Sequence, residues 1–284
     1  MLMPVSRFRL DRALSVGLVH PACQLLDGRR QPRIPILMYH SISTSAGTGH
    51  PYFETNTSPE VFVRHMQFLR HNDYTPLDLD DAVDAMRTGR NMQKCVVITF
   101  DDGYRDFYTH AFPVLAEYGF KATMFIVSGL AGEQRGLRDG KEFMTWEEIR
   151  RIHSGGIRIG SHTVTHPELY SMRPSQIEDE LRRSKSAIED KLGAAVQSFA
   201  YPFAFPEQDR GFVRMLKELL EMHGYQSGVS TILGTAHRGH DAFFLPRLPV
   251  NSYDDLQFFE VKLNGGYDWL HSLQYAHKCV KSVI

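Results

Sequence analysis

The 284-residue chain has few cysteines, almost no net charge and no long apolar run. Its three cysteines, at 23, 95 and 279, lack the spacing of a zinc ligand set, and their odd number does not favour a disulfide framework. The formal net charge of −1 gives no overall positive field for nucleic acid, so we expect any polymer partner to be neutral or weakly charged. No stretch approaches the roughly 20 apolar residues that span a bilayer, so we expect no transmembrane segment.

Residues 1–33 are expected to form a lead-in segment ahead of one larger domain, residues 34–284. Three arginines precede the apolar run 13–19, as in a signal peptide. The run is short, however, and the usual small residue before a cleavage point is missing. We therefore expect an amphipathic lead-in and a cytoplasmic protein, with export as the alternative.

An apolar strand predicted over residues 95–100 ends in two adjacent carboxylates, Asp101 and Asp102. Gly103 then permits a turn that other residues resist. Two carboxylates so close together repel, and their burial is costly unless a cation or a shared proton compensates. A metal site explains the pair, and so does the N-cap of a helix that begins near Tyr104.

A second strand-like run, 157–160, leads into His162 and His166. On one helical turn, positions i and i+4 face the same way, so the two imidazoles could bind a divalent cation together. A carboxylate from another strand end would complete three ligands and leave a position for water, as in catalytic zinc sites. A histidine that caps a helix or bonds a hydroxyl is the alternative, because the chain has 14 histidines.

Three motifs together resemble those of the polysaccharide deacetylase family, which is carbohydrate esterase family 4 and includes the chitooligosaccharide deacetylases. The motifs occupy residues 99–103, 161–166 and 199–203. The blocks 36–42 and 245–250 are similar to those of the branch that N-deacetylates bacterial exopolysaccharides.

Strand-like and helix-like segments alternate along the chain, which predicts a parallel sheet. Ser58 and Pro59 are typical of a helix start, and Gly193 is typical of the end of a helix over 174–192. The resemblance implies that the fold is an incomplete (β/α) barrel. In such barrels the carboxyl ends of the strands face one pocket.

The resemblance implies a divalent metal, zinc with cobalt or nickel as alternatives, held by Asp102, His162 and His166. Asp101 would be the base that takes a proton from a metal-bound water. The metal and the backbone N–H of Phe203 would stabilise the oxyanion. Tyr201 or Phe203 would contact the sugar.

Two features depart from the family pattern. Ala200 stands where an arginine usually orients the base, and Arg247 is the candidate replacement because a guanidinium can grip Asp101 through two hydrogen bonds. A surface ion pair is the alternative for Arg247. The family's late histidine motif has no clean match, so His40 is the expected general acid, with a bracing role at the metal site as the alternative.

The sequence therefore predicts a metal-dependent hydrolase that removes N-acetyl groups from an N-acetylhexosamine glycan. One alternative is an amidase or deformylase of a small N-acylated molecule. The other is a non-catalytic glycan-binding protein on the same fold.

Overall fold

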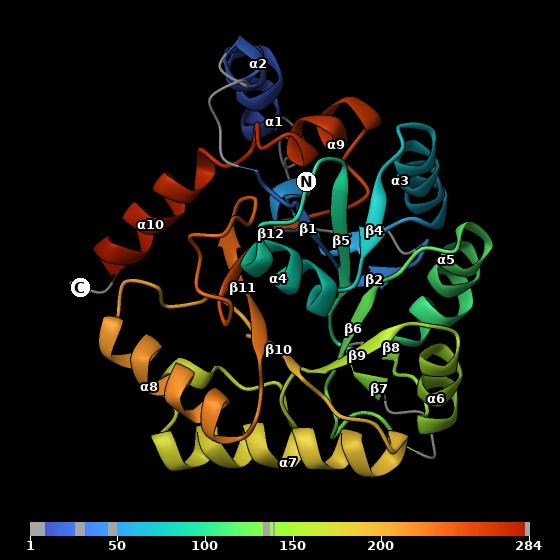
Figure 1. Ribbon diagram of the computed structural model, residues 1–284, viewed down its shortest axis with the longest axis vertical. Coiled ribbons are helices and arrows are strands. Elements are labelled where there is room, and N and C mark those ends of the chain that lie inside the picture. The colour runs from blue at the N-terminus through green and yellow to red at the C-terminus, as the bar shows by residue number, and fades with distance from the viewer. Residues whose placement is uncertain (1–8, 26–31, 45–49, 133–136, 139, 282–284) are drawn as a thin grey trace, which may run out of the picture.

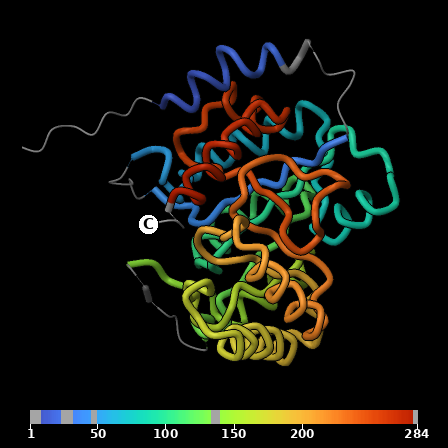
Figure 2. Tube along the Cα trace, turned by 90° about the vertical axis from the view of Figure 1, so that its left-hand side faces the viewer, coloured from blue at the N-terminus to red at the C-terminus, as the bar shows by residue number. Residues whose placement is uncertain are grey.

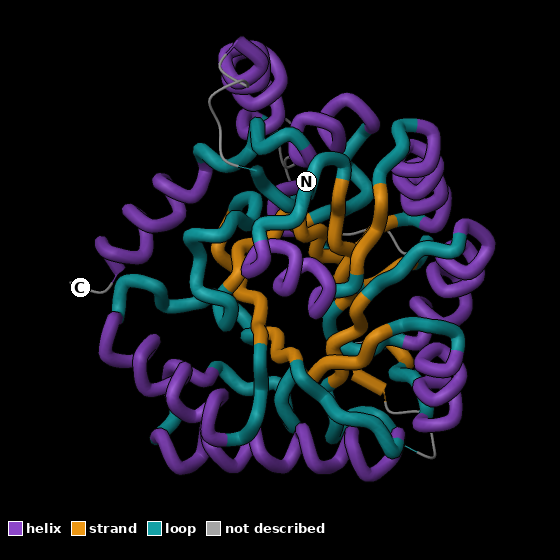
Figure 3. Tube along the Cα trace, viewed as in Figure 1, coloured by secondary structure: helices purple, strands orange, loops and turns teal. Residues whose placement is uncertain are grey.

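Parallel strands form the centre of the molecule, and helices cover its outside (Figure 1). The computed structural model describes residues 9–25, 32–44, 50–132, 137–138 and 140–281. Strands, helices and loops are distinguished in Figure 3, where the strands lie together inside a shell of helices.

In the described part of the chain, seven parallel strands close into a ring because β1 pairs with both β12 and β5. In order around the ring, the strands are β1 (Ile36–Tyr39), β12 (Leu245–Pro249), β11 (Ser227–Leu233), β10 (Ser198–Ala200), β9 (Arg158–Ser161), β6 (Thr123–Ile126) and β5 (Cys95–Phe100). A further strand, β4 (Thr75–Leu77), pairs with the first half of β5. A complete (β/α) barrel has eight ring strands, so the predicted incomplete barrel is confirmed.

The surrounding helices are α3 (Pro59–His71), α4 (Leu79–Thr88), α5 (Phe112–Tyr118), α6 (Trp146–Ser154), α7 (Pro174–Leu192), α8 (Arg210–Met222), α9 (Leu256–Leu263) and α10 (Leu270–Lys281). Local signals set several of their ends. The Ser58 hydroxyl caps α3 by accepting the Val61 N–H, and Gly193 ends α7 with a left-handed φ of 66°. Ile177, whose side chain is fully buried, belongs to the apolar stripe of α7 that faces the barrel.

Two stretches differ from the sequence-based expectation. The helix expected to begin near Tyr104 starts at residue 105 but is not a regular α-helix throughout, because it contains a π-helical turn, Phe107–Ala111, before it continues as α5. Strand β12 was not predicted, because its sequence, Leu-Pro-Arg-Leu-Pro, contains two prolines and prolines usually weaken a central strand.

Short elements complete the fold around the strand ends. They are β2 (Ser41–Ile42) with β3 (Asn56–Thr57), the hairpin β7 (Leu137–Arg138) with β8 (Lys141–Glu142), and two 3-10 turns, Pro51–Phe53 and Leu169–Ser171. Strand β2 follows directly after His40, and β3 pairs with it in parallel.

The N-terminal helical segment lies beside α9, although the two are far apart in the sequence (Figure 2). It consists of α1 (Leu10–Leu14), a π-helical turn (Ser15–Val19) and α2 (His20–Leu25). Residues 1–8 and 26–31 of the predicted lead-in lie outside the described residues, and its boundary at residue 33 stays a prediction. Among the described helices, none is both long and apolar enough to cross a membrane.

Candidate metal centre

Several parallel strands bring polar side chains to one pocket at their carboxyl ends, as barrel geometry requires. The pocket has a volume of about 300 Å³. Seven of its lining residues were singled out from the sequence: His40, Asp101, Asp102, His162, His166, Tyr201 and Phe203. Two further residues that the sequence did not indicate, Thr55 and Thr231, also line it.

Asp102, His162 and His166 form a candidate metal site, with one ligand atom from each residue lying within 4.8 Å of the others. The Nε2 atoms of His162 and His166 lie 3.6 and 3.5 Å from the same Asp102 oxygen. These separations are long for hydrogen bonds. They are close to the ~3.4 Å edge of a tetrahedron with bonds of roughly 2.0–2.1 Å, so this donor set fits a tetrahedral divalent ion.

A hydrogen bond fixes which nitrogen of His162 can bind a metal. Its Nδ1 lies 2.8 Å from the carbonyl oxygen of Ala200. A carbonyl can only accept, so Nδ1 carries the proton and Nε2 keeps its lone pair on the Asp102 side. The side chain of Ala200 cannot replace the arginine expected there, but its backbone carbonyl orients His162, a candidate metal ligand.

The two histidines are carried by a loop, and the helical turn assumed in the sequence analysis is not present. Thr163 and His166 both have left-handed φ angles, of 67° and 57°. The Thr163 hydroxyl accepts the His166 N–H at 3.0 Å, which turns the second imidazole back toward the first.

Neighbouring elements hold this loop by its backbone. Glu180 of α7 accepts the N–H groups of Val164 and Thr165 at 2.7 and 3.0 Å. On the other side, the Gly129 N–H donates to the carbonyl of Val164 at 2.9 Å. A Cβ at position 129 would lie 2.5 Å from that oxygen, so only glycine permits this approach. Neither support was indicated by the sequence.

Backbone strain concentrates at the pocket. Six non-glycine residues of the described chain have left-handed φ angles, and four of them belong to the pocket or the histidine loop: Asp102, Thr163, His166 and Phe203. Each such conformation costs on the order of 1 kcal/mol or more. Strain of this kind clusters at functional sites, where the surrounding structure maintains it.

Asp101 does not bind the candidate metal position but pairs with Arg247 of β12. Arg247 donates from Nη1 and Nη2 to the two carboxylate oxygens of Asp101, each at 2.7 Å. Burial by itself raises the pKa of Asp101, but the charge and hydrogen bonds of Arg247 outweigh it and hold that pKa well below its usual range. Asp101 is therefore an ionised carboxylate enclosed beside the candidate metal site.

The contacts do not fit the alternatives of a helix cap for the aspartates and a surface ion pair for Arg247. The helical stretch that follows the aspartates begins at residue 105, so Tyr104, and neither Asp101 nor Asp102, stands at its N-cap position. Arg247 is fully buried, which rules out a surface ion pair.

His40 lies at the end of β1 with its Nε2 3.9 Å from an oxygen of Asp101, too far for a hydrogen bond. Burial lowers the pKa of His40, and the nearby charge of Arg247 adds to this, against the opposing effect of Asp101 and Asp102. The imidazole faces the pocket without being tied to a carboxylate.

Phe203 and Tyr201 occupy different surroundings. The Phe203 ring is 49% exposed and lies 4.6 Å, between centroids, from the imidazole of His166. Tyr201 is 1% exposed, and its ring packs edge-on against Phe205. Thr231 fixes the turn between them, because its hydroxyl donates to the Phe203 carbonyl at 2.8 Å and accepts the Phe205 N–H at 2.9 Å.

Comparison with known proteins agrees with this geometry. Residues 88–225 match the polysaccharide deacetylase family. The Bacillus subtilis (strain 168) protein YxkH, which is named for that family, is 34% identical over 220 residues, covering 77% of this chain and 72% of YxkH. The chain belongs to the polysaccharide deacetylase family. The resemblance inferred from the three motifs is thereby confirmed.

Two further deacetylases extend the comparison. The poly-β-1,6-N-acetyl-D-glucosamine N-deacetylase of Escherichia coli (strain K12) is 33% identical over 108 residues, which is 34% of this chain and 16% of that protein. The structure of Streptococcus pyogenes deacetylase PplD in complex with acetate matches with a TM-score of 0.71 and 24% identity, covering 82% of this chain and 99% of PplD. The latter likeness supports the barrel fold.

Proposed function

We propose that this polysaccharide deacetylase is a metal-dependent enzyme that removes N-acetyl groups from a glycan containing N-acetylglucosamine. One observation carries the proposal: an ionised, buried Asp101, held at two points by Arg247, lies beside a three-ligand site. A base and a metal position placed together fit metal-assisted amide hydrolysis. The E. coli relative, named for poly-β-1,6-N-acetyl-D-glucosamine, supports this substrate class.

The proposed metal ligands are Asp102, His162 and His166. A divalent ion bound there, with zinc first and cobalt or nickel as alternatives, would polarise an amide carbonyl and make water acidic enough to ionise near neutral pH.

The chain itself supplies the groups that move protons. Asp101 takes a proton from water as the water oxygen adds to the acetyl carbon. His40 protonates the departing nitrogen as the C–N bond breaks, which releases acetate and leaves a free amine on the sugar. Because burial lowers its pKa, His40 is mostly neutral near pH 7, so the proton that it delivers is the one that Asp101 has taken from water. A carboxylate oxygen of Asp101 lies 3.9 Å from the His40 Nε2.

Phe203 contributes through both its backbone and its ring. Its carbonyl and left-handed φ of 58° are fixed by the turn that Thr231 holds, and we propose that its N–H donates to the developing oxyanion. The exposed ring borders the pocket and offers an apolar face to a sugar.

Acetate release tests the proposal. Purified protein would be incubated with β-1,6-linked poly-N-acetylglucosamine, with chitin oligosaccharides and with N-acetylglucosamine itself. Each assay would be run as prepared, after chelation, and after zinc, cobalt or nickel is restored. We expect release from the polymer or oligomers that is lost on chelation and regained with metal. Release that survives thorough metal removal would overturn the proposed mechanism.

A further inference from the structure

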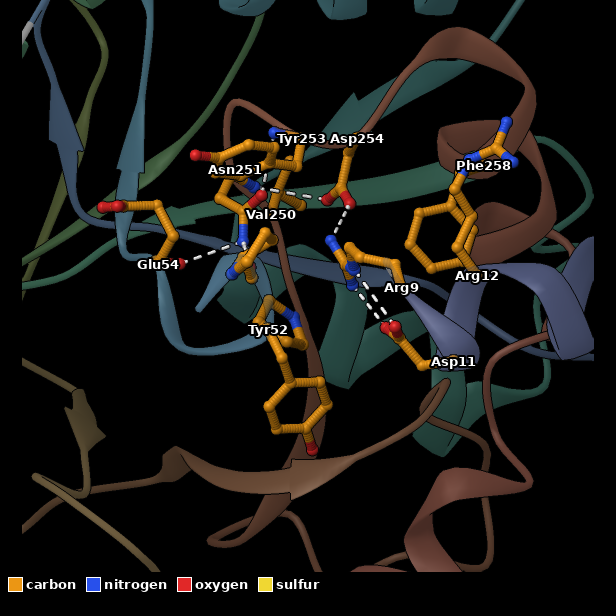
Figure 4. Close-up of polar contacts among 12 residues, drawn as sticks. Arg9, Asp11, Arg12, Tyr52, Glu54, Val250, Asn251, Tyr253, Asp254 and Phe258 are labelled. Carbon is orange, nitrogen blue, oxygen red and sulfur yellow. Dashed lines mark hydrogen bonds and ion pairs between the residues drawn. The ribbon is translucent and has the colours of Figure 1, made fainter. Parts of the chain in front are cut away.

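Four buried charges connect the N-terminal helical segment to the barrel. They are Arg9, Asp11, Asp254 and Lys262, here called the charge cluster, and Figure 4 labels the first three of them. Arg9 donates from Nη1 to Asp254 at 3.1 Å, and it also binds Asp11 through Nε and Nη2. Lys262 donates to the other oxygen of Asp254 at 2.7 Å. Two positive and two negative groups thus compensate one another inside the protein.

Stability alone is a weak reason for such a cluster. Removing four charges from water costs several kcal/mol, and apolar residues of similar volume often stabilise a core equally well or better. What the ion pairs provide is a fixed geometry, because a guanidinium binds its partners in defined directions. The contacts that these four residues make with other parts of the barrel therefore indicate which segment the cluster positions.

Asp254 connects the cluster to Asn251 within the turn that follows β12. The Asn251 N–H donates to the same Asp254 oxygen that binds Lys262, at 3.2 Å. The Asn251 side-chain amide then donates to two backbone carbonyls, of Pro51 at 2.8 Å and of Glu54 at 3.0 Å. Figure 4 shows this line of contacts, from Arg9 through Asp254 and Asn251 to the backbone at Glu54.

Segment 51–57, which Asn251 holds, borders the pocket that contains the candidate metal site. Thr55 lines the pocket itself. Asn56 and Thr57 form β3 and pair with Ser41 and Ile42, the residues that directly follow His40. A displacement of this segment would therefore reach both the pocket wall and the chain next to the proposed acid.

We propose that Arg9 is a positioning residue for the pocket, acting through Asp254 and Asn251 on segment 51–57. The inference rests on the proposed function, because it assigns a task to the wall of the same site. Arg9 then has a task at the pocket, in contrast to the lead-in role that the sequence predicts for residues 1–33.

The test compares Arg9→Met, Arg9→Lys and, as a matched control, Arg12→Met. Arg12 lies in α1, three residues after Arg9, but its side chain is 32% exposed and pairs with that of Asp255, which is 54% exposed. Amide hydrogen exchange would be followed at Tyr52 and Phe53, whose N–H groups are both bonded to His50. Kinetics on the glycan and bound metal would be measured on the same samples.

Arg9→Met should speed exchange at these two amides about tenfold, and KM should rise several-fold while kcat and metal content stay within about twofold. Arg9→Lys, which keeps one charge, should recover part of the loss, and Arg12→Met should match the parent protein. A second variant, Asn251→Ala, leaves Arg9 and its partners in place but removes the link to segment 51–57. It should reproduce the exchange and KM changes, including in the case that Arg9→Met does not fold.

A merely structural role predicts a lower melting temperature in Arg9→Met with unchanged exchange at segment 51–57 and unchanged KM, and that result would overturn the inference. Faster exchange at segment 51–57 in Asn251→Ala, with unchanged exchange in both Arg9 variants, would also overturn the inference. Exchange needs no substrate, so the exchange data decide the positioning role even if no glycan is deacetylated. Conversely, a failed exchange test leaves the proposed function intact.

Discussion

Arg247 and Asp101 form a two-point ion pair inside the barrel, with both N–O distances at 2.7 Å. Arg247 is fully buried, and its remaining donors reach the Thr99 hydroxyl and the Ser230 carbonyl. Because partners from β5 and its end and from β11 hold the guanidinium, its orientation is fixed before any substrate binds. Strand β12 thus supplies the arginine that is missing at Ala200.

Replacing Arg247 tests what the pair does for the base. In Arg247→Met, burial of Asp101 is no longer compensated, so its pKa should rise instead of staying below its usual range. The acidic limb of the kcat/KM profile should therefore move to higher pH by more than about one unit. The free energy of unfolding should fall by about 3–5 kcal/mol, the usual cost of a buried charge that loses its partner.

Arg247→Lys is the control, because it keeps the charge but loses the two-point geometry. Its pH profile should lie closer to that of the parent protein, with a reduced kcat. A folded Arg247→Met enzyme with an unchanged pH profile would show that Arg247 does not govern the protonation of Asp101.

Substitutions of the two adjacent aspartates, Asp101 and Asp102, should have different effects. Asp102→Ala removes one of three proposed ligands, so both bound metal and activity should be lost. Asp101→Asn keeps the ligands but cannot accept a proton, so metal should remain while kcat falls by about 10²–10⁴-fold. Metal analysis of dialysed protein, paired with acetate release, distinguishes the two. An active Asp101→Asn enzyme would remove Asp101 as the base.

The parts of the structure that could be predicted are those fixed by neighbours in the sequence. The Ser58 cap, the Gly193 end of α7 and the polar residues after β5 and β9 are local signals. Barrel topology then groups the strand ends, so the sequence could indicate a common pocket without giving any distance.

The missed parts depend on contacts between distant segments. The two prolines of β12 argue against a strand, and only its place between β1 and β11 overrides them. Glu180, which lies 14 residues after His166 in α7, supports the histidine loop, and no local sequence pattern indicates this contact. Arg9 looked like part of a basic leader because its partner Asp254 lies 245 residues away.

The Phe203 turn should depend on one hydroxyl. Thr231→Val removes the group that bonds the Phe203 carbonyl and the Phe205 N–H. The proposed oxyanion donor should lose its fixed position, and kcat should fall roughly 10–100-fold, as is usual for supporting groups around a site. Thr231→Ser keeps both hydrogen bonds and should retain most of the activity. Equal activity of the Val and parent proteins would contradict a role for this turn.

His65 should make the stability of the fold sensitive to acid. Its Nε2 donates to the Asp254 carbonyl at 2.8 Å, and its Nδ1 accepts the Tyr39 hydroxyl at 3.0 Å. Burial is the main cause that lowers the pKa of His65, to about 4. In the unfolded chain the pKa of this histidine is near 6.5. Between about pH 4 and pH 6.5 the unfolded chain therefore binds a proton that the folded protein does not bind. The free energy of unfolding should therefore fall as the pH drops from about 6.5 to about 4, by at most about 3 kcal/mol from this group.

His65→Gln isolates that contribution, because an amide can accept from Tyr39 and donate to the Asp254 carbonyl but does not titrate. Urea unfolding at pH 7 and pH 4.5 should show a smaller loss of stability in this variant than in the parent protein. His71→Gln, at an exposed histidine of the same helix, should leave the parent's pH dependence unchanged. If His65→Gln and the parent lose equal stability on acidification, His65 takes up its proton inside the fold, and burial does not hold it neutral.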